Sequence, residues 1–86
     1  MINRSDNPVE WTLLVDELTE ASEHLTSAIS QITTDPAYDE SALAVHLGHV
    51  MAHLNRAWAS RNISRELTDS EWEQFREYQP DLRPIA

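Results

Sequence analysis

The chain has 86 residues and no cysteine, and its 15 acidic and six basic residues give a net charge of −9. This length predicts one domain, and the lack of cysteine excludes disulfides, thiolate metal sites and cysteine nucleophiles. The acidic balance and the absence of an apolar run of about 18 residues argue against nucleic acid or a membrane as a partner.

Residues 8–32 are predicted to form a long helix. A single glycine and four prolines provide few of the turns that a small all-β domain needs. Asn7 is the expected N-cap, with Pro8 at the first helical position and Glu10 at the third. The apolar side chains alternate spacings of three and four residues, which is the a and d pattern of a helix that packs along one seam. They are Trp11, Leu14, Leu18, Ala21, Leu25, Ala28 and Ile32.

A second helix is predicted over residues 39–61. Pro36 ends the first helical pattern, because proline disfavours helical torsions in the residue before it. The connection is short, so the two helices should fold back as an antiparallel hairpin. Gly48 within this helix suggests the close approach of a neighbouring helix, or else a glycine that the helix merely tolerates. The apolar seam consists of Leu43, Leu47, Val50, Leu54 and Ala57.

A short third helix is predicted over residues 69–78. Thr68 and Glu71 have the spacing of a capping box, and Trp72 lies on the apolar side. Two prolines then favour an extended tail over residues 79–86. Together these elements predict an all-α fold, in which an antiparallel helical hairpin is joined by a short third helix.

One flank of the predicted hairpin is apolar. With Leu18 and Leu47 assigned to position a of the heptad, this flank consists of position e side chains, which a short third helix cannot cover along the whole hairpin. We therefore expect a homodimer in which two hairpins form a four-helix bundle. The expected interface residues are Val15, Ile29, Met51 and Trp58.

The opposite flank gathers all four histidines and several carboxylates. A turn near residue 36 or 37 places side by side those residues whose numbers sum to about 73, such as His24 with His49. The patch then spans about two helical turns, roughly 10 Å. Neutral imidazole and ionised carboxylate are suitable ligands for Zn, Fe, Mn or Ni. The candidate metal ligands are Glu20, His24, His49 and His53, with His46 and Glu17 as outer members.

The same residues also have a simpler interpretation. Imidazole rings at the edge of a seam cover apolar neighbours and hydrogen-bond to carboxylates such as Glu17 or Glu20 without any metal. The register likewise pairs Arg56 with Glu17 in a salt bridge. Both interpretations place these side chains along one edge of the hairpin.

Known catalytic motifs are incomplete in this chain. His49 and His53 have the spacing of the HExxH zinc-protease helix, but Val50 stands where that mechanism needs its general-base glutamate. No glutamate stands three residues before a histidine, as the di-iron helical bundles require. Because a nucleophile elbow and a glycine-rich phosphate loop are also missing, we expect no catalysis and no cofactor.

We expect a cytoplasmic protein-interaction or assembly module without a signal peptide. The alternative is a divalent-metal-binding helical bundle that uses the histidine and glutamate patch, with hydrolytic or redox activity at the metal. A second alternative is an acidic antitoxin-like or decoy partner of a basic protein, since residues 1–43 hold nine acidic residues and one arginine.

Overall fold

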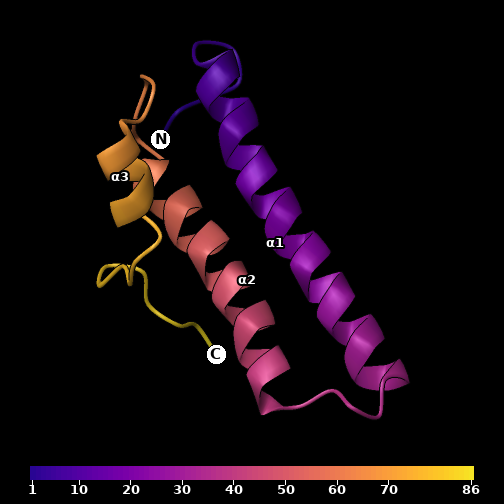
Figure 1. Cartoon of the computed structure of the whole chain (residues 1–86). Helices are drawn as coiled ribbons and strands as arrows, with labels where there is room; N and C mark the ends of the chain where they lie inside the picture. The colour runs from indigo at the N-terminus through magenta and orange to yellow at the C-terminus, as the bar shows by residue number, and fades with distance from the viewer.

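The structure, a computed structural model, describes all 86 residues and consists of three helices without strands. α1 (Pro8–Thr34) and α2 (Glu40–Ser60) form an antiparallel hairpin, and the short α3 (Asp69–Gln74) lies beside the end of α2 (Figure 1). The prediction of an all-α fold with a helical hairpin is confirmed. None of the three helices has the length and apolarity needed to cross a membrane.

The two long helices begin differently. Asp39 caps α2, and its side chain accepts a hydrogen bond from the backbone N–H of Ala42 at 2.9 Å. Asn7 precedes α1 but makes no such bond, so the side-chain cap expected there is absent. Its side-chain oxygen instead accepts the backbone N–H of Asn3 at 3.3 Å. The N-terminal turn thus uses the side chain that would otherwise have capped α1.

α3 is shorter than the helix predicted over residues 69–78, although the predicted capping box is present at its start. The last α-helical hydrogen bond runs from the Phe75 backbone N–H to the Glu71 carbonyl at 2.8 Å, and the helix ends at Gln74. The Glu77 N–H then donates to the Gln74 carbonyl at 3.2 Å, with the spacing of a turn. The Arg76 carbonyl accepts from outside the helix, from the side-chain amide of Asn55 on α2 at 2.9 Å.

The core is small and lies at the end of the hairpin where α1 begins and α2 ends. Ile2, Leu14 and Ala57 form a buried cluster, and Trp11 packs against it. The backbone N–H of Ile2 donates to the Arg61 carbonyl at 2.8 Å, which ties the N-terminal segment to the end of α2. Because only eight of the 86 residues are buried, the single chain hides little apolar surface.

Half of the predicted seam is buried between α1 and α2. Side chains at position d lie inside the hairpin, whereas those at position a are exposed apart from Trp11, which packs against the buried cluster. The two helices therefore pack on their d positions and their polar flank, and the a positions beyond Trp11 remain uncovered. The buried d residues are Leu14, Ala21, Ala28, Val50 and Ala57, and the exposed a residues are Leu18, Leu25, Ile32, Leu47 and Leu54.

Gly48 does not mark a close approach of two helices. A methyl group added at this position would meet no atom within 4 Å. The expectation from the sequence is wrong here, because position 48 faces away from α1 while the helices meet along their d positions.

Candidate functional site

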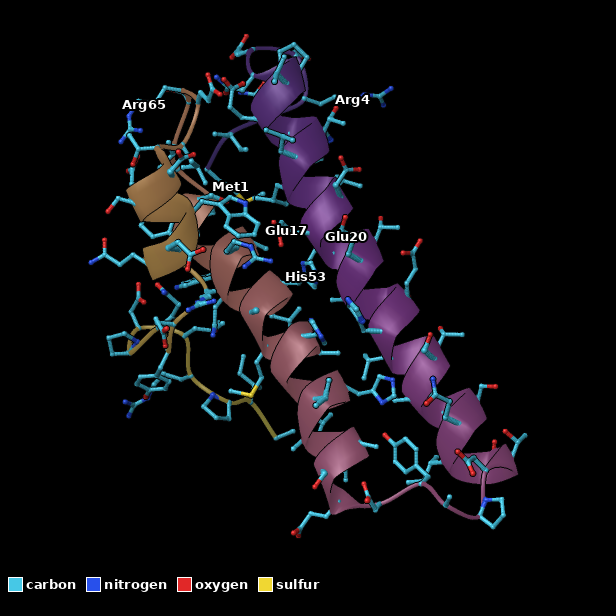
Figure 2. The ribbon with its side chains drawn as sticks, in the orientation of Figure 1. Met1, Arg4, Glu17, Glu20, His53 and Arg65 are labelled. Carbon is cyan, nitrogen blue, oxygen red and sulfur yellow. The ribbon has the colours of Figure 1, made fainter.

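Two carboxylates of α1 meet a histidine and an arginine of α2 in what we call the polar cluster, formed by Glu17, Glu20, His53 and Arg56. Figure 2 shows the Glu17, Glu20 and His53 side chains pointing toward one another between the two helices. Nδ1 of His53 lies 2.8 Å from Oε2 of Glu17 and 3.3 Å from Oε2 of Glu20. Nε of Arg56 donates to Oε1 of Glu17 at 3.0 Å. The predicted register is confirmed, since residue numbers in the Glu20–His53 and Glu17–Arg56 pairs each sum to 73.

The hydrogen-bond chemistry places the ring proton of His53. A carboxylate can only accept, so the short contact with Glu17 requires a proton on Nδ1 of His53. Nη2 of Arg56 lies 3.2 Å from the same nitrogen, and because both groups are then donors this is a packing contact. Glu17 thus accepts from both side chains, one on each carboxylate oxygen.

The burial of the α2 side chains makes these contacts important for the stability of the fold. Arg56 is only 6% exposed and His53 is also buried. Burying a charged group costs free energy unless it is paired and hydrogen-bonded. Glu17 meets this requirement for both α2 side chains, since one of its carboxylate oxygens accepts from His53 and the other from Arg56.

Three histidine rings form a stacked column beside the polar cluster. The His24 ring of α1 stacks on that of His49 with 4.6 Å between ring centres and on that of His53 with 5.3 Å. The planes are nearly parallel in the first pair, at 8°. The predicted neighbourhood of His24 and His49 is thus confirmed, and their rings pack face to face.

His46 lies apart from this column. Its Nδ1 is 2.9 Å from the Tyr38 hydroxyl, and the two rings are stacked with 5.8 Å between their centres. The partner comes from the loop between α1 and α2, which the heptad pattern does not describe. His46 was expected at the edge of the metal patch. Its side chain instead contacts Tyr38 and so joins α2 to the loop that precedes it.

The predicted metal ligands are brought together only in part. One group of three potential ligands has its ligand atoms within 4.8 Å of one another, and it consists of Glu17, Glu20 and His53. Imidazole and carboxylate suit a borderline divalent cation. Arg56, however, already supplies positive charge to Glu17 and lies beside Nδ1 of His53. An ion at this point would have to displace the guanidinium group.

The sequence analysis missed the partner of Arg56 outside the hairpin. The guanidinium carbon of Arg56 lies 4.2 Å from the centre of the Trp72 ring on α3, in a cation–π contact. No spacing rule relates position 56 to position 72, because the segment between α2 and α3 is irregular. The contact joins α3 to the polar cluster.

Three of the four expected interface residues are exposed. Ile29 is 63% exposed and Met51 56%, and Val15 is also uncovered. Trp58 is half-buried instead, because its ring lies 3.7 Å from the Arg61 guanidinium carbon and its Nε1 donates to Asp81 at 3.1 Å. That indole hydrogen bond, together with Arg61, lowers the pKa of Asp81 below its ordinary value.

The chain matches no protein-family model, no curated protein and no solved structure.

Proposed function

We propose that this chain is a cytoplasmic assembly module that pairs with a second copy of itself to form a four-helix bundle. The observation that carries the proposal is a continuous apolar face on the hairpin. It is formed by exposed side chains at positions a and e of both helices, and we call it the a/e face. Its members are Val15, Leu18, Leu25, Ile29, Ile32, Leu47, Met51 and Leu54.

The a stripes of both helices lie on the same side of the hairpin. Glu17 and His24 of α1 contact His53 of α2, and all three occupy position g. Position a lies on the other side of the buried d line from position g in each helix. The two a stripes therefore form a single face, opposite the polar cluster.

The size of the a/e face favours a protein partner. Eight aliphatic side chains that are each about half exposed offer on the order of 700 Å² per chain, close to the roughly 800 Å² that one partner contributes to a standard interface. Monomeric soluble proteins seldom expose apolar patches larger than roughly 600 Å². A second copy supplies a matching face of the same heptad spacing, which supports the choice of occupant.

The dimer is tested by measuring mass in solution. Sedimentation equilibrium at micromolar concentration is expected to report twice the 9.9 kDa chain mass. Replacing Ile29 and Met51 by Glu should return the mass to that of one chain, because charge would be buried at the interface. The milder Ile29→Ala and Met51→Ala changes should together raise the dissociation constant about tenfold or more.

A matched control separates loss of the a/e face from added charge. Val9 and Val45 are also exposed valines on α1 and α2, but they lie at position f, outside the a/e face. The Val9→Glu, Val45→Glu pair should leave the dimer intact. A monomer at hundreds of micromolar, or equal dissociation by both pairs, would contradict the proposal.

Divalent-metal binding is a second candidate, favoured by the convergence of Glu17, Glu20 and His53. Zn or Mn should then raise the melting temperature of untagged protein in proportion to the logarithm of free metal. His53→Ala should abolish this shift, whereas His46→Ala should not. Arg56→Gln should enlarge the shift by removing the competing guanidinium. An unchanged melting temperature with every metal would remove this candidate.

A further inference from the structure

A cleft of about 450 Å³ opens on the hairpin side opposite the a/e face, between α1 and the segment that leads from α2 into α3. Four apolar side chains line it, and two of them are conspicuously uncovered: Leu13 and Trp72, the latter 47% exposed. The other two are Ile63 and Leu67. Leu13 lies at position c, away from the hairpin seam, so helix packing does not account for an aliphatic residue there.

The rim of this cleft is negatively charged and uncompensated. Glu10, Asp16, Glu66 and Asp69 line it, and none of them takes part in an ion pair. The two arginines of the lining are already engaged, Arg56 with Glu17 and Arg65 with Glu71. An occupant of the cleft therefore meets four free carboxylates around an apolar floor.

The Trp72 ring indicates that the floor of the cleft favours a cationic group. The protein's own Arg56 guanidinium lies over this indole ring at 4.2 Å. An aromatic ring attracts cations at its faces, and Trp does so most strongly. With nearly half of its surface exposed, Trp72 can receive a second cationic side chain from outside.

We propose that the cleft binds a short basic segment of a partner protein, in which arginine or lysine side chains alternate with apolar ones. The apolar side chains would pack on Leu13 and Trp72, and the cationic groups would pair with Asp16, Glu66 and the neighbouring carboxylates. Charge complementarity decides the occupant, because an acidic or neutral segment would leave these carboxylates without a partner. The volume falls within the roughly 300–1,000 Å³ of small-ligand sites, which limits the segment to a few residues.

The cleft and the a/e face are independent surfaces. Leu13 and Asp16 occupy positions c and f of α1, roughly opposite positions a and e around the helix. A dimer formed through the a/e face leaves the cleft open on each copy. Peptide binding can therefore fail while the dimer mass persists, and the dimer can fail while peptide binding persists.

The proposal is tested with a labelled, end-capped peptide of about six residues that alternates arginine with leucine. Fluorescence anisotropy of the full chain should show saturable binding of one peptide per chain, with a dissociation constant on the order of 10–100 μM. Affinity should fall about tenfold between about 50 and 300 mM salt, because the paired charges are exposed and screened. Peptides that alternate glutamine or glutamate with leucine should bind at least tenfold more weakly.

Two variants locate the binding and a third controls for charge. The Asp16→Asn, Glu66→Gln pair should weaken binding about tenfold, and Leu13→Asn should do so by several-fold without changing charge. The Glu23→Gln, Glu73→Gln pair makes the same charge change outside the cleft and should leave affinity within about twofold. Circular dichroism of each variant confirms folding. Absent saturable binding, equal binding of the glutamine peptide, or equal loss with the control pair would overturn the proposal.

Discussion

Arg56 is the residue on which the polar cluster depends most. It is nearly inaccessible to solvent, donates to Glu17 and stacks on Trp72. A buried guanidinium has lost its hydration, so its partners must replace the lost hydrogen bonds and charge. Glu17 in turn relies on Arg56 and His53 for its compensation. One side chain thus couples α1, α2 and α3.

Removing the Arg56 charge is expected to lower the free energy of unfolding substantially. Arg56→Gln leaves Glu17 with less compensation in a largely buried place, and we expect a loss of about 2–3 kcal/mol, below the 3–5 kcal/mol of fully buried pairs. Arg76→Gln is the control, because the ion pairs of Arg76 with Glu73 and Glu77 are exposed. It should cost less than about 1 kcal/mol. Urea denaturation measures both, and equal losses would contradict this role of Arg56.

At the scale of elements, each long helix has apolar side chains at positions a and d of the heptad. Only side chains at position d are buried between α1 and α2. α2 also contains one glycine that the packing does not require. α3 spans six residues, too few for stability without its cap and its contacts. Gly48 in α2 and the short α3 each limit the stability of their element, and both effects can be measured through the free energy of unfolding.

Gly48→Ala is expected to stabilise α2. Glycine within a helix costs about 1 kcal/mol relative to alanine, and open space around position 48 accommodates a methyl group. The free energy of unfolding should rise by about that amount in chemical denaturation. A loss of stability would mean that another surface packs tightly on this side of α2.

The cap of α3 should respond to acid. The Arg65 side chain, followed by the Thr68 backbone N–H, lowers the pKa of Glu71 from 4.5 to about 2 by hydrogen bonding. Because the folded pKa lies below the unfolded value, the Glu71 carboxylate stabilises the fold above pH 4.5, and this stability is lost as pH falls toward 2.

Carboxyl titration by NMR should place the Glu71 pKa near 2. Glu71→Gln should remove its share of the pH dependence of stability in this range. Glu73→Gln on the same helix serves as the comparison, because Glu73 takes no part in the capping box. A Glu71 pKa near 4.5 would show that the cap and the Arg65 pair are not formed in solution.

For the whole molecule, the decisive property is that the two broad sides of the hairpin are unlike. One presents the a/e face, and the other carries the polar cluster, the histidine column and the acidic cleft. With few residues buried in a single chain, association through the a/e face would enlarge the core without disturbing the polar side. Stability and assembly should then be coupled.

This coupling predicts a melting temperature that rises with protein concentration. For a dimer that unfolds to single chains, a hundredfold increase in concentration should raise the midpoint by about 5–8 °C. The Ile29→Glu, Met51→Glu pair should melt at a temperature independent of concentration. A wild-type midpoint that does not move across this range would contradict obligate pairing.

Much of the architecture could be predicted from residue order alone. The alternating apolar spacing located both long helices, and the loop around Pro36 determined the register that brings Glu17 to Arg56 and His24 to His49. These are local or nearly local properties. Helix periodicity and a short connection leave two antiparallel helices few ways to align.

Tertiary structure decided the remainder. Whether d or a side chains fill the hairpin depends on how far the helices roll about their axes. In the structure the d side chains lie inside, and His53 and Arg56 contact Glu17 on the adjoining flank. The stacking of His46 on Tyr38, the early end of α3 and the cleft at Leu13 all involve irregular segments. The sequence determined which helices form and how they align, because those choices depend on periodic local interactions. The contacts of Trp72 with Arg56 and of Tyr38 with His46, and the cleft at Leu13, depended on irregular segments, for which no periodicity exists.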